Sequence, residues 1–322
     1  MSAVECGLSP AKEFPKSFSP VFPVFICLGM ALAAPATWPQ DSSKKAPAPS
    51  GAATPASATT EKPKAKGFPS PEAAAAALSN AARENDSDQL LVILGPEGQD
   101  LVHWSQNSSD IDEQRHIFAD KYDQMHRVVR EPDNTVALYV GAENWPLPIP
   151  IVEYNGAWYF DAELGRQEIL YRRIGRNEIS AVDVSAELVE AEKEFFGAAH
   201  NYTSKFVSTA GSHDGLYWKS SGAPTRSPVG LYLAQAGVND SVKNHQPFFG
   251  YFYRIVLRSG AAGDVSGFLV EAFPAEYRSS GVMTFLTDDQ GTAYEKDLGP
   301  GTPAAALQLT AGSLDDTWKK VE

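Results

Sequence analysis

Residues 177–206, NEISAVDVSAELVEAEKEFFGAAHNYTSKF, form the stretch that decides the fold of this chain. Apolar residues recur in it at intervals of three and four, which is the spacing of one face of an α-helix. These residues are Ala181, Val184, Leu188, Ala191, Phe195, Ala198, Tyr202 and Phe206. Asn177 is a suitable N-cap, so the pattern predicts a long helix that begins there. A stripe of this length needs an apolar surface to pack against.

The segments that follow supply that surface. Residues 248–257, 267–273, 282–286 and 292–295 are rich in aromatic and β-branched residues, which favour strands. The last two segments are joined by residues 287–291, a polar turn in which Gly291 tolerates a positive φ. The sequence therefore predicts a second domain, residues 176–322, in which one helix packs on an antiparallel sheet.

Helices come first in the segment before this domain. Ser70 is an N-cap with Pro71 at the first helical position, and the alanine-rich run to Arg83 favours a helix. A second helix is expected over residues 86–94, closed by Gly95. A third should begin at Asp110, with Glu113 completing a capping box. Its apolar stripe is Ile111, Gln114, Phe118, Tyr122, Met125 and Val129.

Strands follow these helices. Residues 135–140 and 149–154 favour β-structure, and Asn155-Gly156 joins the latter to residues 157–160 in a tight hairpin. Helices followed by a curved antiparallel sheet predict a first domain over residues 68–175. The fold class is therefore α+β, with two domains.

The beginning of the chain predicts export. Lys12 and Lys16 precede an apolar run, residues 21–34, and small residues then offer cleavage sites for a signal peptidase, so residues 1–36 read as a signal peptide. An uncleaved anchor is the alternative. Both cysteines, Cys6 and Cys27, lie in this leader, so the mature protein would have no disulfide. Residues 37–67, rich in Ala, Pro and Lys, are expected to be a disordered linker.

Charge is distributed unevenly along the chain. The net charge is -13, yet the linker carries an excess of lysine, and the residues after it hold 20 basic and 36 acidic side chains. A body this acidic repels phosphate backbones, which argues against nucleic-acid binding. The basic linker is compatible with weak contact to a membrane surface or a cell-wall polymer, and a solvated spacer is the alternative.

Residues with catalytic chemistry are few. His213-Asp214-Gly215 could place an imidazole beside a carboxylate, but an Asp-Gly turn before Leu216, Tyr217 and Trp218 explains the same residues. His116 and His126 are expected on one helix, too far apart to share an ion. Asp288 and Asp289 lack the ligand pattern of a calcium loop and read as a polar turn. No catalytic residue, metal or cofactor is predicted.

A ligand pocket is one interpretation of the first domain. Its strands carry Tyr139, Trp145, Tyr154, Trp158 and Asp161, which could line an apolar cavity and hold a small molecule. The alternative is that the aromatic residues form the core.

Eight ordered segments together resemble a known family. They are WPLPIP (145–150), WYFD (158–161), RIGRNE (173–178), HDGLYW (213–218), GYFYR (250–254), PAEY (274–277), GVMTF (281–285) and YEKDLG (294–299). They resemble the bacterial domain-of-unknown-function family 2950, and His213, Asp214, Gly215, Tyr217 and Trp218 belong to one of these motifs. The resemblance implies a bacterial exported protein and assigns no activity. The first half is also similar to nuclear-transport-factor-2-like cone folds, and the second to the globular sheet of pilins.

These observations favour an exported, non-enzymatic binding or scaffolding protein of the cell envelope, located in the periplasm or outside the cell. Its partner would be an envelope protein or polymer that the sequence does not identify. One alternative is a small-molecule-binding protein or enzyme that uses a cavity in the first domain. Another is a pseudopilin-like secretion component, although the charge pattern lacks the membrane segment that pilins need.

Overall fold

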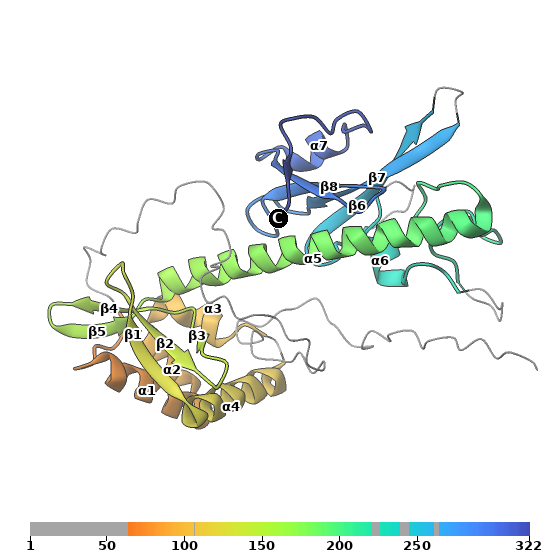
Figure 1. The fold of residues 1–322 in the computed structure, drawn as a ribbon. Helices are drawn as coiled ribbons and strands as arrows, with labels where there is room; N and C mark the ends of the chain where they lie inside the picture. Colours follow the sequence, from red (N-terminus) through yellow and green to blue (C-terminus); the bar gives the residue numbers. More distant parts are fainter. Residues whose placement is uncertain (1–63, 106, 220–225, 239–244, 261–263) are drawn as a thin grey trace, which may run out of the picture. The chain divides into compact units, whose positions relative to one another are not determined.

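The computed structural model of the chain describes residues 64–105, 107–219, 226–238, 245–260 and 264–322 (Figure 1). These residues divide into two compact units, 64–167 and 168–322. Each unit combines helices with an antiparallel sheet, which confirms the predicted α+β class. The signal peptide expected over residues 1–36, and the linker expected over 37–67 except its last four residues, lie outside the described residues.

The helices of the first unit begin with two that match the sequence prediction. They are α1 (Pro71–Arg83), α2 (Ser87–Leu94), a 3-10 turn η2 (Pro96–Gly98), α3 (Gln99–Val102) and α4 (Ser108–Gln124). Ser70 Oγ caps α1 by accepting the Ala73 N–H at 3.1 Å, and Asp86 Oδ1 caps α2 by accepting the Gln89 N–H at 2.9 Å. Gly95 closes α2 with a φ of 77°. These side chains cap the helices that local sequence assigned to them.

Both ends of α4 differ from the prediction. Its N-cap is Asn107, whose Oδ1 accepts the Ser109 N–H at 3.2 Å, whereas Asp110 lies in the first turn. An acidic residue there complements the helix dipole, so Asp110 is accommodated without being the cap. The helix ends at Gln124, and Met125 is exposed. The predicted stripe was wrong beyond Tyr122, because the β-branched pair before Arg130 joins the sheet.

The first sheet consists of β1 (His126–Arg130), β2 (Val136–Val140), β3 (Trp145–Pro146), β4 (Ile151–Tyr154) and β5 (Ala157–Phe160). The strand order is β1-β2-β4-β5, with β3 paired to β2. Asn155 and Gly156 have φ angles of 51° and 76°, which confirms the predicted hairpin between β4 and β5. Strand β1 was not predicted, and it places His126 on the sheet rather than on a helix with His116.

One face of this sheet is buried beneath α1, α2 and α4. These helices contact β1, β2 and β5. Val136, Ile151 and Phe160 lie opposite one another in neighbouring strands and are all buried. This row marks the face that the helices cover.

A helix of 38 residues, α5 (Ala162–Ala199), begins well before Asn177. The predicted start was wrong: Asp161 Oδ1 accepts the Leu164 N–H at 3.0 Å at the true beginning. Asn177 lies inside the helix, and its Nδ2 donates to the Ser280 carbonyl at 2.8 Å. Residues 162–176 contain no proline, so a helix that starts at Asp161 can continue through them. The boundary between the two units falls within α5.

The second unit contains the predicted sheet. Its other elements are α6 (Leu231–Gln235), β6 (Tyr251–Ser259), β7 (Val265–Pro274), β8 (Met283–Asp288), β9 (Ala293–Asp297), α7 (Thr302–Ala306) and β10 (Lys319–Lys320). The strand order is β10-β9-β8-β7-β6, antiparallel throughout. The four expected strands are confirmed, and β10 is an addition. Gly291, with a φ of 86°, lies in the predicted turn between β8 and β9.

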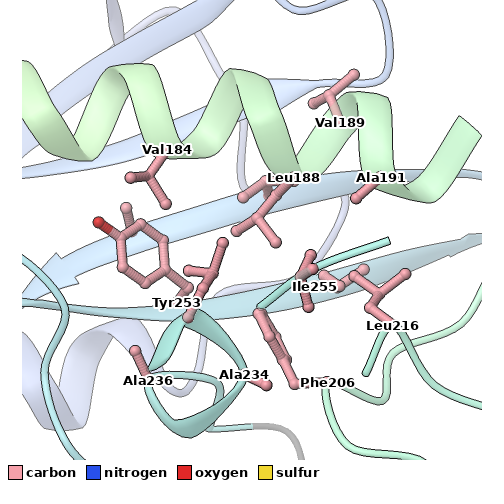
Figure 2. Packing of buried hydrophobic residues seen from close by; sticks show 14 of the residues in the cluster. Val184, Leu188, Val189, Ala191, Phe206, Leu216, Ala234, Ala236, Tyr253 and Ile255 are labelled. Carbon is pink, nitrogen blue, oxygen red and sulfur yellow. The ribbon is translucent and has the colours of Figure 1, made fainter. Parts of the chain in front are cut away.

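The apolar stripe of α5 packs on this sheet, as predicted. Leu188 packs in one buried cluster with Tyr253 and Ile255 of β6 (Figure 2), and Phe195 belongs to the same cluster. The helix ends at Ala199, so the prediction that Tyr202 and Phe206 continue it was wrong. The chain instead leaves the helix at His200, with a φ of 57°, and Phe206 returns to the same core from the loop.

The opposite face of the second sheet holds a buried ion pair. Arg254 Nε donates to Glu271 Oε2 at 2.7 Å, and the guanidinium also donates to the carbonyls of Ala306 and Leu309. Burial raises the pKa of Glu271 to about 7, against the opposing effect of Arg254. The pair fixes the C-terminal end of α7 against β6 and β7. Within the described residues, no helix combines the length and apolarity needed to cross a membrane.

Candidate functional site

The residues predicted to line a pocket in the first unit are divided between the two faces of its sheet. Side chains alternate along a strand, so Trp145 and Trp158 lie on the face that the helices cover. Tyr139 and Tyr154 lie on the opposite face. Asp161 follows β5 and caps α5. The structure does not bring these five residues together on one surface.

The aromatic rings of this sheet are held by charged neighbours. The Arg127 guanidinium lies over the Tyr139 ring, 4.3 Å from its centroid, and Tyr139 Oη donates to Glu131 Oε1 at 2.9 Å. The Arg130 guanidinium lies 5.3 Å from the centroid of Trp158. Contacts of this kind are typical of aromatic residues at the edge of a core, where one part of the ring is buried and the other part is exposed.

Two depressions flank Lys66 in the first unit. Their volumes are about 530 and 260 Å³, and both are open to solvent. The larger is lined by residues 64–66 together with Leu91, Val92 and Gln99. None of the five residues predicted for a pocket lines either depression.

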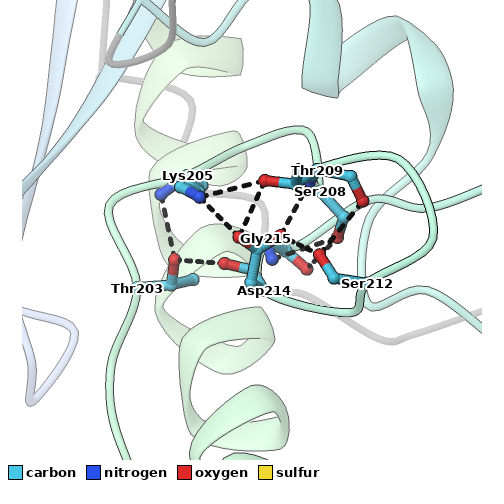
Figure 3. Close-up of polar contacts among 7 residues, drawn as sticks. All are labelled: Thr203, Lys205, Ser208, Thr209, Ser212, Asp214 and Gly215. Atoms are coloured by element: carbon cyan, nitrogen blue, oxygen red, sulfur yellow. Dashed lines mark hydrogen bonds and ion pairs between the residues drawn. The ribbon is translucent and has the colours of Figure 1, made fainter.

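The His213–Trp218 motif forms a hydrogen-bonded loop after α5 (Figure 3). The Asp214 carboxylate forms an ion pair with Lys205 and accepts hydrogen bonds from Ser212 Oγ and from the Thr209 N–H, both at 2.7 Å. The Lys205 ammonium, followed by these donors, holds the pKa of Asp214 well below its usual range. Asp214 is therefore a carboxylate whose contacts fasten its own loop.

The remaining residues of the motif form hydrogen bonds with an earlier segment of this loop, residues 206–208. The His213 ring stacks on Trp218, with centroids 4.4 Å apart. The Gly215 N–H donates to Ser208 Oγ at 3.0 Å, and the Tyr217 N–H donates to the Phe206 carbonyl at 2.8 Å. A Cβ atom on Gly215 would lie 2.9 Å from backbone atoms of the paired segment, so this position requires glycine.

Glu192 is a buried carboxylic acid at the base of this loop. Its Oε2 accepts the Thr203 N–H at 3.2 Å, whereas Oε1 has no hydrogen-bond partner among the described residues. Thr203 Oγ1 in turn donates to the Asp214 carbonyl at 2.9 Å. Burial raises the pKa of Glu192 to about 8. This residue was not among the predicted sites, although its spacing, four residues after Leu188 and three before Phe195, places it on the buried face of α5.

The remaining polar candidates have local contacts. Asp288 Oδ1 accepts the N–H groups of Gln290 and Thr292 at 3.0 and 2.8 Å, and Asp289 pairs with Arg258 at 3.7 Å. Across the described parts of the chain, no three His, Cys, Asp or Glu side chains gather closely enough to hold a metal ion.

Two turns of the second unit contain side chains in an unusual backbone conformation. Of the seven described non-glycine residues with positive φ, four are asparagine, which tolerates that conformation; the others are His200, Phe249 and Arg278. Phe249 and Arg278 have φ angles of 50° and 61°, and both side chains are exposed. An aromatic residue at such a φ is a genuine outlier, so the surrounding structure must hold it in place.

Adjacent residues of α5 provide that support. Asn177 Nδ2 donates to the Ser280 carbonyl, and the neighbouring Glu178 Oε1 accepts the N–H groups of Val282 and Met283 at 2.9 and 3.0 Å. A Cβ atom on Gly250 would lie 2.5 Å from Asn177 Nδ2 and 3.0 Å from Ser280 Cβ. The turns that carry Phe249 and Arg278 are therefore packed against each other and against α5.

These two turns present a small exposed surface, here called the 249/278 surface and defined by Phe249, Tyr277 and Arg278. The Arg278 guanidinium lies 5.4 Å from the centroid of the Tyr277 ring, and Tyr277 Oη donates to Asp297 at 3.1 Å. Arg278 makes no ion pair with a described carboxylate. Sequence reasoning missed this surface, although motifs 173–178, 250–254, 274–277 and 281–285 supply its supports.

Comparison with known proteins gives one result. The family model described as "Protein of unknown function (DUF2950)" matches residues 65–321, which is nearly all of the described chain. Neither a curated protein nor a solved structure matches. The match spans both units, and the chain belongs to the DUF2950 family.

Proposed function

We propose that the chain is an exported, non-enzymatic binding or scaffolding protein of the cell envelope, and that the 249/278 surface is where a protein partner docks. The leader sequence supports export. The strained backbone at Phe249 and Arg278 is the single observation that carries the binding role. Such conformations cost about 1–3 kcal/mol each and persist where the surrounding structure fixes them.

The composition of this surface also supports binding. Aromatic residues and arginine are enriched among the residues that contribute most to protein interfaces. Phe249 is 39% exposed on a turn fixed by Asn177 and Ser280, so its side chain loses little freedom when a partner covers it. Arg278 stacks on Tyr277 and retains donors for a partner's carboxylate.

We infer that the second unit has a pilin-like arrangement, since α5 packs along an antiparallel sheet built from hairpins. We infer a cone-like first unit from its helices on one face of an antiparallel sheet. Neither likeness assigns a binding partner.

Substitution by asparagine tests the binding role, because asparagine tolerates a positive φ. Phe249→Asn and Arg278→Asn should each stabilise the protein by about 1 kcal/mol in urea denaturation through relief of backbone strain. The same variants should lose a partner that the wild-type protein captures from solubilised envelopes, with recovery reduced by about 30-fold for a hot-spot residue. Gain of stability with loss of binding is the signature of a residue kept for function.

Val265→Asn is the matched control, because Val265 is also 39% exposed but has an ordinary strand conformation. This variant should keep the partner and gain no stability. The proposal fails if wild type, Phe249→Asn and Arg278→Asn all recover the same proteins in the same amounts.

A further inference from the structure

Strand β1 is the outer strand of the first sheet, and only β2 pairs with it among the described residues. The Glu131 N–H donates to the Thr135 carbonyl at 2.9 Å, and the Gly141 N–H donates to the Met125 carbonyl at 2.8 Å. Hydrogen bonds of an antiparallel pair involve every second residue, so the odd-numbered residues of β1 bond to β2. The backbone N–H and C=O groups of its even-numbered residues point away from the sheet, and no described residue bonds to them.

The other outer strands are protected from pairing. On β5, the N–H groups of Phe68 and Trp158 each donate to the carbonyl of the other, both at 2.8 Å. On β6, Tyr253 exchanges hydrogen bonds with residues 236–238. Strand β10 is two residues long. Strand β1 has five residues, no proline and a continuous register with β2, so it lacks the bulge, the proline or the cover that protects an edge.

Charged side chains can also guard an edge, but the two arginines of β1 lie over the faces of the sheet. The Arg127 guanidinium lies over the Tyr139 ring, and its Nε donates to Asn144 Oδ1 at 2.8 Å. The Arg130 guanidinium lies over the Trp158 ring on the opposite face. Both arginines are exposed, and neither forms an ion pair with a described carboxylate. The edge therefore combines accessible backbone groups with one cation on each face.

We propose that β1 binds an extended peptide segment of another protein as an additional strand, and that this segment carries acidic side chains opposite Arg127 and Arg130. In such complexes the main-chain hydrogen bonds give affinity, and alternate side chains give specificity. Opposite charges directly across two strands stabilise their pairing. An apolar residue fits opposite Val128, which is half-buried. This site lies in the first unit and is independent of the 249/278 surface.

Charge selects an acidic segment as the occupant. The chain has a net charge of -13, whereas β1 contains two arginines and no acidic residue. Most of the acidic chain repels an acidic segment, so the arginines favour its binding at this edge. Pairing over the full strand with β1 of a second copy would place the arginines of both copies along one seam, and like charges there are destabilising.

Fluorescence anisotropy with the full chain and a labelled peptide, Gly-Glu-Thr-Val-Glu-Thr-Gly, tests the proposal. The two glutamates of this peptide lie opposite Arg130 and Arg127 when its valine pairs with Val128 in antiparallel orientation. The peptide should bind saturably, and its version with lysine in place of both glutamates should not. Methylation of the valine amide should abolish binding, whereas methylation of the preceding threonine amide should not, because only the valine N–H faces β1.

Variants of β1 test the same site from the side of the protein. Val128→Pro should weaken peptide binding more than about ten-fold, because it removes an outward N–H while the bonds to β2 remain. Val128→Thr, which keeps the N–H, is the matched control and should bind as wild type does. Arg127→Gln and Arg130→Gln should each weaken binding about two- to five-fold. Arg173→Gln, an exposed change on α5, should have no effect.

Melting temperatures establish that each variant is folded, and the arginine variants and methylated peptides decide the matter if Val128→Pro is not. Absence of binding by wild type overturns the proposal, as does equal binding of the two methylated peptides. Equal binding by wild type, Arg127→Gln and Arg130→Gln also overturns it. Dimerisation of the wild type in analytical ultracentrifugation that Val128→Pro abolishes would assign the edge to a second copy and contradict the acidic segment.

Discussion

At the scale of single residues, Glu192 shows how burial changes the chemistry of an ordinary side chain. It lies on α5 between the exposed residues Glu190 and Glu194, yet it is fully buried. With one oxygen bonded to Thr203 and the other unpartnered, the neutral acid is favoured over the carboxylate. Its pKa of about 8 makes it protonated at neutral pH.

This protonation predicts a pH-dependent stability. In the unfolded chain Glu192 ionises near its ordinary pKa of 4.5, whereas in the folded protein it ionises only near 8. At pH values between these two, the unfolded state binds fewer protons than the folded state. The contribution of Glu192 to the free energy of unfolding therefore falls as pH rises and levels off above pH 8. The total change is on the order of 5 kcal/mol. Glu192→Gln removes this dependence.

Urea denaturation across this pH range checks the prediction. The difference in unfolding free energy between Glu192→Gln and wild type should shift in favour of the variant as pH rises. Glu190→Gln, an exposed change on the same helix, should give a curve parallel to that of wild type. A constant difference between Glu192→Gln and wild type at all pH values would show that Glu192 is ionised in the fold.

At the scale of elements, α5 shows that three glycines in one helix have different roles. A Cβ atom on Gly165 would lie 2.9 Å from Ile149 Cγ1 and 3.2 Å from Ile149 Cα, so backbone blocks it. At Gly175 and Gly197 no atom of the described residues, apart from the adjoining turns of the helix itself, lies within 4 Å of the Cβ position. The first glycine permits close packing, and the other two only lower helix propensity.

Alanine substitution separates these roles. Gly175→Ala and Gly197→Ala should each raise the free energy of unfolding by about 0.5–1 kcal/mol through higher helix propensity. Gly165→Ala should lower it by about 1–3 kcal/mol because the methyl group overlaps Ile149. Chemical denaturation of the three variants provides the measurement, and a stabilising Gly165→Ala would contradict the packing described here.

At the scale of the whole molecule, charge changes along the sequence. An apolar run over residues 21–34 and a lysine-rich segment precede the acidic residues that follow, and our proposal of export rests on this order. The described residues contain no cysteine, so no disulfide stabilises them, and their stability rests on the apolar cores, above all the cluster between α5 and its sheet.

The proposed export predicts a defined processed form. The mature protein should begin between Ala34 and Thr37, because Ala31-Leu32-Ala33 and Ala34-Pro35-Ala36 both offer small residues suited to signal peptidase. Intact mass of the protein released by osmotic shock provides the measurement. Replacing Ala33 and Ala36 together by arginine should block cleavage. Recovery of wild-type chain starting at Met1 from the membrane fraction would contradict the prediction.

The sequence alone determined the elements whose signals are local. Ser70, Asp86 and Gly95 delimit α1 and α2, Asn155-Gly156 makes a hairpin, and the stripe of α5 identifies its buried face. Each depends on capping, turn chemistry or periodicity within a few residues. Asp161, by contrast, was predicted to line a pocket, whereas the structure shows that it caps α5.

Tertiary structure decided what depends on distant partners. Strand β1 forms because β2 pairs with it, and α5 continues through Asn177 because the residue binds Ser280 instead of capping a helix. The positive φ of Phe249 is fixed by packing around Gly250, and Glu192 is neutral because a loop covers it. These features arise from contacts between residues far apart in the chain, and local propensity carries no record of them.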